Sequence, residues 1–241
     1  MTHLVDDGPG FGPCKPFGIN VASGRLMART TGKPSRSAPT DPVPPVRSID
    51  ALAAAAESCQ ACPLFASATQ AVFGEGPTRA DIVLVGEQPG NEEDLSGHPF
   101  VGPAGAVLDQ ALREAGIDRG AVYVTNAVKH FSWEPRGKRR IHKKPRVSEI
   151  KACQPWLSAE LTRIKPKVTV CMGTSAIQSL LGPKMTIGAA RGQVFETTHG
   201  PVVVTRHPSS VLRVQEREER RAALAELVED LRRAAKLTTA K

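Results

Sequence analysis

Four short, Val-rich and almost wholly apolar runs are spaced along this chain, with segments of helical periodicity between them. The runs cover residues 81–85, 122–125, 168–171 and 202–205. Strands that are apolar on both faces and alternate with helices are typical of a parallel sheet covered on both sides. The pattern therefore predicts a three-layer α/β/α fold with a central, mainly parallel sheet of four strands.

Helical periodicity appears in five segments that surround these runs. They cover residues 49–58, 104–115, 148–164, 174–181 and 215–235. Ser48 is a suitable N-cap for the first segment, and Gly116 is a suitable stop for the second. We expect these helices to cover the sheet.

One folded domain is predicted over residues 48–237. Residues 1–47 are rich in Pro without an apolar period, which is typical of a disordered arm, and residues 238–241 form a tail. No apolar run approaches the roughly 20 residues that cross a bilayer, and the N-terminus is acidic where a signal peptide would be basic. We expect a cytoplasmic monomer without a membrane partner, in which the five cysteines are thiols or metal ligands.

Polar residues follow each predicted strand. They are the loop 86–90, Asn126, the segment 173–175 and the segment 206–210. Since ligands of open α/β sheets bind beyond the carboxyl ends of the strands, these residues are expected to meet in one cleft. The loop 86–90 lacks the Lys-Ser/Thr of a phosphate loop, so nucleotide hydrolysis is disfavoured, and an ordinary turn is the alternative interpretation.

A basic segment over residues 129–146 carries nearly all of the net charge. Its eight Lys and Arg against one Glu give +7, compared with +8 for the whole chain. Phe131 and Trp133 lie among the cations, which suits phosphate contacts combined with base stacking. We predict a flexible loop over a nucleic-acid groove; a solvated charged loop or a targeting sequence is the alternative.

Two histidines lie near the predicted cleft. His142 is inside the basic segment, where surrounding cations favour a neutral, nucleophilic ring, although a phosphate contact is an alternative. His207 follows a strand and precedes Pro208, which places it on a turn. A structural hydrogen bond is its alternative role.

A Cys-x-x-Cys pair, Cys59 and Cys62, has the spacing of half a zinc or iron–sulfur site. His130 and Cys153 are candidates for the other two ligands. A redox dithiol is the rival interpretation, but the pair follows a helix instead of opening one after a strand.

Five ordered strings, GEQPG, GHPFVGPAG, VYVTNAVKH, GKRRIH and HPSS, resemble the motifs of the iron–sulfur uracil-DNA glycosylases, specifically the family-four-like UdgX group. The resemblance runs from about Cys59 to the final helix. It implies the uracil-DNA glycosylase fold and a role in DNA repair.

The resemblance also implies roles for individual residues. Phe100 would stack on a flipped-out uracil, Asn126 would read its edge, and His207 would hydrogen-bond the oxygen that gains charge as the base leaves. Glu87 corresponds to the residue that assists attack on the sugar in family-four enzymes. Gly86 and Asp94 complete the implied substrate-binding set.

Gln88 and the loop Lys138–His142 distinguish the UdgX group. There the matching histidine, here His142, attacks C1′ of the sugar and leaves the protein joined to DNA. The implied DNA-binding residues are Lys138, Arg139, Arg140, Lys143 and Ser209.

The resemblance implies a [4Fe–4S] cluster on Cys59, Cys62, His130 and Cys153, with zinc as the alternative metal. His130 replaces a fourth cysteine of typical family-four enzymes, a change that raises a cluster's reduction potential. Arg206 and the stretch 132–135 also depart from the family pattern.

The sequence thus predicts a protein that excises uracil from DNA, preferentially single-stranded, and becomes covalently linked through His142. One alternative is a glycosylase that turns over, with His142 only a phosphate contact. Another is a non-catalytic, metal-stabilised single-strand binding protein.

Overall fold

The computed structural model describes residues 42–239. Most of the predicted arm and the end of the predicted tail lie outside this range, so those predictions stay untested. No helix in the described range is long and apolar enough to cross a membrane.

The centre of the fold is a five-stranded sheet in the order β2-β1-β5-β7-β6. The strands are β1 (Ile82–Gly86), β2 (Tyr123–Asn126), β5 (Val168–Met172), β6 (Val194–Thr197) and β7 (Gly200–Thr205). The first four in this order run parallel, and β6 pairs antiparallel with β7 at the edge. The predicted α/β fold with a mainly parallel central sheet is confirmed, although the sheet has five strands instead of four.

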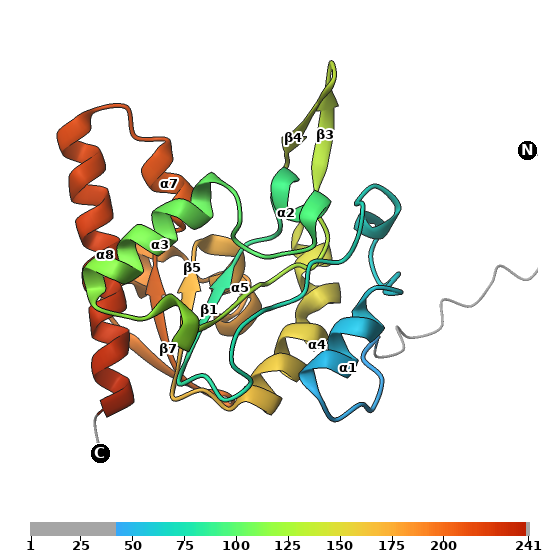
Figure 1. The fold of residues 1–241 in the computed structure, drawn as a ribbon, viewed down its shortest axis with the longest axis horizontal. Helices are drawn as coiled ribbons and strands as arrows, with labels where there is room; N and C mark the ends of the chain where they lie inside the picture. Colours follow the sequence, from blue (N-terminus) through green and yellow to red (C-terminus); the bar gives the residue numbers. More distant parts are fainter. Residues whose placement is uncertain (1–41, 240–241) are drawn as a thin grey trace, which may run out of the picture. The chain divides into compact units, whose positions relative to one another are not determined.

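Helices cover both faces of the sheet (Figure 1). Alternate residues of a strand point to opposite faces, and in β1 Val83 and Val85 belong to one hydrophobic cluster while Ile82 and Leu84 belong to the other. The first cluster includes residues of α1 (Ile49–Ala56), α4 (Val147–Ile164) and α5 (Thr174–Leu181), and the second includes residues of α3 (Pro103–Ala115) and α8 (Arg217–Thr239). These are the five helices predicted from periodicity, with ends shifted by a few residues.

Shorter elements connect these layers. They are the 3₁₀ turns η1 (Pro63–Ala66) and η2 (Arg119–Ala121), and the helices α2 (Asn91–Ser96), α6 (Ile187–Ala190) and α7 (Pro208–Leu212). His207 is the N-cap of α7, which agrees with its predicted non-helical position.

The basic segment is a β-hairpin, which corrects the prediction of a flexible loop. Strands β3 (Trp133–Arg136) and β4 (Arg139–His142) pair antiparallel, and Gly137 at the turn has a φ of 60°, a conformation that glycine adopts at little cost. The hairpin projects from the body of the molecule beside α2 (Figure 1). Its residues are largely exposed, so they lack the apolar alternation by which a strand is predicted.

Candidate active site

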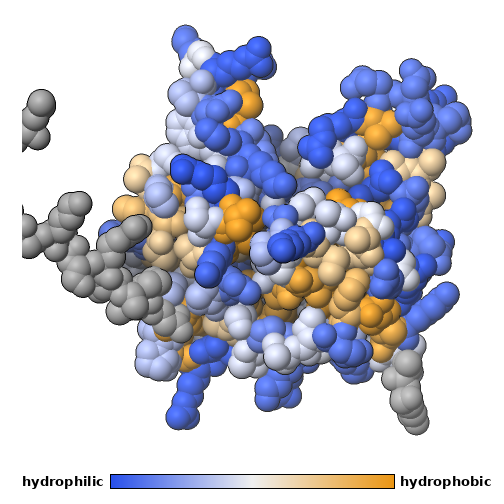
Figure 2. Space-filling model, turned by 180° about the vertical axis from the view of Figure 1, so that it is seen from behind, coloured by the Kyte–Doolittle hydropathy of each residue, from blue (hydrophilic) through white to orange (hydrophobic). Residues whose placement is uncertain are grey.

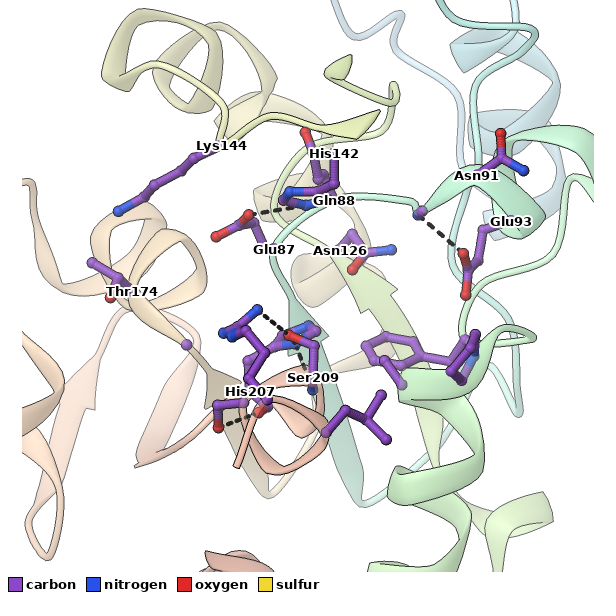
Figure 3. A pocket seen from close by; sticks show the side chains of 18 of the residues that line it. Glu87, Gln88, Asn91, Glu93, Asn126, His142, Lys144, Thr174, His207 and Ser209 are labelled. Atoms are coloured by element: carbon purple, nitrogen blue, oxygen red, sulfur yellow. Dashed lines mark hydrogen bonds and ion pairs between the residues drawn. The ribbon is translucent and has the colours of Figure 1, made fainter. Parts of the chain in front are cut away.

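A cavity of about 760 Å³ opens beyond the carboxyl ends of the parallel strands. Seven of the predicted site residues line it together: Glu87, Gln88, Phe100, Asn126, His142, His207 and Ser209. Figure 3 shows Glu87, Gln88 and His142 on one side of this cavity, with His207 and Ser209 opposite. In Figure 2 a hollow separates two hydrophilic projections, the hairpin and the surface over the α7–α8 connection.

Phe100 and His207 form one wall of the cavity. Their rings are stacked, with centroids 6.1 Å apart and an angle of 29° between the planes. Phe100 has a φ of 58°, an uncommon conformation for a bulky residue that costs on the order of 1–3 kcal/mol. Gly105 packs directly against this strained backbone, because a Cβ there would lie 1.8 Å from the Phe100 carbonyl oxygen.

Asn126 is buried at the end of β2, yet its side-chain amide has no hydrogen-bond partner among the described residues. It faces the cavity, so its donor and acceptor are free for a ligand. Gly86, its register partner on β1, makes this arrangement possible. A Cβ at Gly86 would lie 2.4 Å from Oδ1 of Asn126 and 2.6 Å from Cζ of Phe100.

The hydrogen bonds of His207 determine which ring nitrogen carries its proton. Nδ1 accepts the backbone N–H of Ser209 at 3.2 Å and lies 2.8 Å from its Oγ. Burial lowers the pKa of His207 to about 4, although the carboxylate of Glu87 opposes this. The ring is therefore neutral at pH 7 with its proton on Nε2, which can act as a hydrogen-bond donor.

Glu87 connects two further side chains. Its Oε2 accepts a hydrogen bond from the buried hydroxyl of Ser175 at 2.7 Å, and its Oε1 lies 3.3 Å from Nε2 of His142. Burial acts to raise the pKa of Glu87, but the contacts with His142 and Ser175 outweigh it and the pKa lies below its ordinary value. An ionised carboxylate is therefore held against the imidazole of His142.

Gln88 contacts the base of the hairpin at the residue before β3 and the residue after β4. Its Nε2 donates to the carbonyl oxygens of Ser132 at 3.0 Å and Lys143 at 3.2 Å, and its Oε1 accepts the N–H of Ser132 at 3.1 Å. These three bonds occupy the side-chain amide. Gln88 therefore holds the hairpin that carries His142 against the cavity.

The predicted DNA-binding cations divide into two groups. Lys138, Arg139 and Lys143 are exposed on the hairpin, where they can reach phosphates. Arg140 departs from its predicted role, because its guanidinium lies 2.5 Å from the carboxylate of Asp94. Asp94 departs likewise: it is fully buried and absent from the cavity lining, so it does not face a substrate there.

The predicted metal ligands lie apart from the cavity. No set of three or more His, Cys, Asp or Glu side chains in the described range is placed to hold a metal ion. Cys59 and Cys62 nevertheless pack against the same hydrophobic cluster that contains Cys153. Sγ of Cys153 accepts the N–H of Lys129 and Sγ of Cys59 accepts Nε1–H of Trp156, both at 3.2 Å. His130 is buried without a hydrogen-bond partner for its ring among the described residues.

Sequence reasoning did not single out three side chains that contribute to the candidate site. Ser175 was within a segment expected at the cleft, but nothing distinguished its hydroxyl from that of Thr174. Glu93 accepts the N–H groups of Gly90 and Gly102, at 3.0 and 2.9 Å, and so joins two loops that line the cavity. Lys144 lines the cavity as well, and its only sequence signal was membership of the basic segment.

Comparisons with known proteins point to one family. Residues 73–232 match the family described as the uracil DNA glycosylase superfamily. The chain is 41% identical over 171 residues to a type-4 uracil-DNA glycosylase of Thermotoga maritima, an alignment covering 70% of this chain and 85% of the relative. It is 38% identical over 171 residues to a type-4 uracil-DNA glycosylase of Archaeoglobus fulgidus, covering 67% and 82%. A type-5 uracil-DNA glycosylase of Pyrobaculum aerophilum is 28% identical over 152 residues, covering 56% and 63%.

Proposed function

The chain belongs to the uracil-DNA glycosylase superfamily, and from this premise we propose that it excises uracil from DNA and captures the resulting sugar covalently through His142, as in the UdgX group. One observation carries the second half of this proposal. The imidazole of His142 lies at the cavity wall, 3.3 Å from the carboxylate of Glu87. A histidine that served only as a phosphate contact would not need this position.

The cavity suits a base that has left the helical stack. A uracil within a duplex is out of reach, so the enzyme extrudes it or takes a single strand, where unstacking costs least. Phe100 offers a ring for stacking, and the free amide of Asn126 offers one donor and one acceptor for the base edge. We therefore propose a preference for single-stranded DNA, with the exposed cations of the hairpin contacting phosphates.

The neutral ring of His207 can assist cleavage of the bond between C1′ of the sugar and N1 of uracil. As the C1′–N1 bond breaks, its electron pair moves to the uracil and leaves a cationic sugar. Nε2–H of His207 can donate to the uracil oxygen on which the negative charge develops. A donor fixed in advance at the site of developing charge lowers the barrier more than it strengthens ground-state binding.

Capture of the sugar then requires one lone pair and one proton acceptor. A ring nitrogen of His142 donates its lone pair to C1′ and forms the new C–N bond, which gives a cationic ring. The proton on the other ring nitrogen can pass to the ionised Glu87, and the uracil anion takes a proton from solvent. A tethered nucleophile has a large effective-concentration advantage over water, and turnover stops if the new bond is stable.

We further propose a [4Fe–4S] cluster on Cys59, Cys62, Cys153 and His130. Three thiols and a buried imidazole without a hydrogen-bond partner among the described residues have the chemistry of such a donor set, and hydrogen bonds reach two of the sulfurs. In the described range the four side chains are not gathered into a ligand group. When bound, the cluster would crosslink segments distant in sequence and so stabilise the fold. Iron, zinc and acid-labile sulfide analysis of the purified protein decides between this cluster and zinc; absence of both metals would contradict a metal site here.

A denaturing gel tests the proposed function. The protein is mixed with single-stranded DNA that contains one uracil, and with the same strand containing thymine. We expect a shifted band, resistant to denaturation, with the uracil strand alone. His142→Ser should remove this band and release abasic product. Repeated turnovers by the wild type without a shifted band would favour the turning-over alternative, and equal affinity for both strands without product would favour a non-catalytic binder.

A further inference from the structure

The hairpin β3–β4 projects from the fold with little apolar surface, so its position depends on specific contacts. Arg140, in the middle of β4, supplies several of them. Its Nε donates to Oδ1 of Asn91 at 2.9 Å, and its Nη1 donates to Oδ2 of Asp94 at 2.5 Å and to Oγ1 of Thr69 at 3.2 Å. One guanidinium therefore joins the hairpin to α2 and to the segment that precedes β1.

Two aromatic rings pack on the same guanidinium. Its carbon lies 5.5 Å from the centre of the Phe131 ring and 5.6 Å from that of Trp133. Trp133 is itself held by a 2.8 Å hydrogen bond from Nε1 to the carbonyl oxygen of Ser67, and Phe131 is buried. The two aromatic residues that the sequence suggested for base stacking therefore also contact a side chain of the protein.

Asp94, the acidic partner of Arg140, is itself held in place by further hydrogen bonds. Asp94 is fully buried, and its two carboxylate oxygens also accept the N–H of Thr69, at 2.9 and 3.2 Å. A buried carboxylate needs its cation, because an unpaired charge there is strongly unfavourable. The ion pair therefore ties the hairpin to a rigid point of the fold.

Arg140 and His142 are two residues apart on β4, so their side chains leave the same face of the strand. The position of one constrains the position of the other. We propose that Arg140 is a positioning residue: bound to Asp94, it holds the hairpin closed before DNA arrives and places His142 beside Glu87. Resting on the proposed function, this inference adds that Arg140 decides whether the sugar cation is captured by His142 or by water.

Hydrogen exchange of the DNA-free protein tests whether the Arg140–Asp94 ion pair, the anchor of the hairpin, holds β3 and β4 in place. This measurement does not depend on activity. Arg140→Met and Asp94→Asn should each accelerate amide exchange in β3 and β4 by about tenfold or more. Arg139→Met is the matched control, since Arg139 is exposed on the same strand and its side chain has no hydrogen bond or ion pair with a described residue. Unchanged exchange in both anchor variants would overturn the proposal.

The ratio of covalent adduct to released abasic strand tests whether Arg140 affects capture of the sugar by His142. For each variant, the covalent adduct and the released abasic strand are measured per uracil excised. Arg140→Met should raise the released share by about tenfold relative to wild type, whereas Arg79→Met, which removes an exposed cation outside the hairpin and the cavity lining, should leave the partition as it is. Arg140→Lys, which keeps the charge and loses the planar contacts, should fall between them.

The outcomes separate this inference from the proposed function. If wild type forms no adduct, the proposed function fails, while the exchange experiment still decides the anchor. If wild type forms the adduct and Arg140→Met partitions identically, the positioning role fails. Should Arg140→Met prove unfolded by its melting profile, Asp94→Asn and Arg140→Lys are compared with wild type by the same two measurements.

Discussion

At the residue scale, the two carboxylate oxygens of Glu87 have different partners. Ser175 donates to Oε2, which leaves Oε1 facing His142. Because Ser175 is fully buried on α5, its hydroxyl cannot turn to solvent. This hydrogen bond therefore helps to orient Glu87 toward the imidazole of His142.

Ser175→Ala should therefore slow adduct formation by roughly 10- to 100-fold, since a hydrogen bond to a charged group is worth about 1.5–3 kcal/mol. Single-turnover kinetics with a uracil-containing strand measure this rate. Ser179→Ala is the control, because Ser179 is buried on the same helix and donates to the backbone of Ala176. Equal rates for the two variants would show that Ser175 does not orient Glu87.

His207 should be neutral from pH 7 down to near its pKa of about 4, with its proton on Nε2. Nitrogen NMR of the histidine rings reads both the tautomer and the titration. Because the folded-state pKa lies below the ordinary 6.5, the stability that this group contributes is present above pH 6.5 and is lost as the pH falls toward 4. Titration near pH 6.5, or a proton on Nδ1, would contradict the proposed donor.

At the element scale, the ends of β1 and β2 shape the base pocket. Gly86 and Asn126 are paired in register, and no side chain separates them. Substitution by Ala would place a methyl group where the amide of Asn126 and the ring of Phe100 now lie.

Gly86→Ala should consequently reduce uracil capture by roughly 100-fold, about 2.7 kcal/mol in the barrier, in a protein that remains folded. Gly188→Ala serves as the comparison, because a Cβ there meets no atom within 4 Å. Circular dichroism and the gel assay are run on both. Full capture by Gly86→Ala would mean that the base binds elsewhere.

The elements that could be predicted are those in which a pattern within the element itself, such as a continuous apolar run, indicates the structure. The four parallel strands were recognised because burial on both faces makes them continuously apolar, and their predicted ends differ from the observed ones by at most two residues. Strand β6 was missed because it is a partly exposed edge strand without a continuous apolar run. The hairpin was missed because contacts of Arg140, Trp133 and Gln88 with distant segments hold it.

At the scale of the whole molecule, fewer cations are free to bind DNA phosphates than the net charge of +8 suggests. Lys129 is buried against Glu160 at 2.5 Å, and Arg140 is paired with Asp94. Lys143 and Arg146 also have acidic partners. Of the eight cations in the basic segment, the four without an ion pair to a described residue are Arg136, Lys138, Arg139 and Lys144.

The dependence of single-strand binding on salt should reflect these four cations. Each phosphate neutralised contributes about −0.7 to the slope of log K against log salt, so the segment should contribute about −3. Equilibrium titrations of His142→Ser with the thymine-containing strand, which contains no uracil to excise, give the slope. A quadruple variant at these positions shows how much of the slope comes from the basic segment. A contribution near −6 would mean that the paired cations also contact phosphates.

The location of the site could be predicted from the sequence, because polar residues after parallel strands must meet at one edge of the sheet. The contacts within the site could not. Ser175 and Glu87 are 88 residues apart in the chain, and the sequence does not show that Asp94 is buried and paired with Arg140.

The central claim is that His142 itself becomes bonded to the sugar. Mass spectrometry of peptides from the protein–DNA product tests it most directly, because the fragment that carries the deoxyribose remnant identifies the bonded residue. We predict that the remnant is on His142 and that uracil is released in equal amount. A remnant on another residue, or a peptide map without one, would contradict the mechanism proposed for this chain.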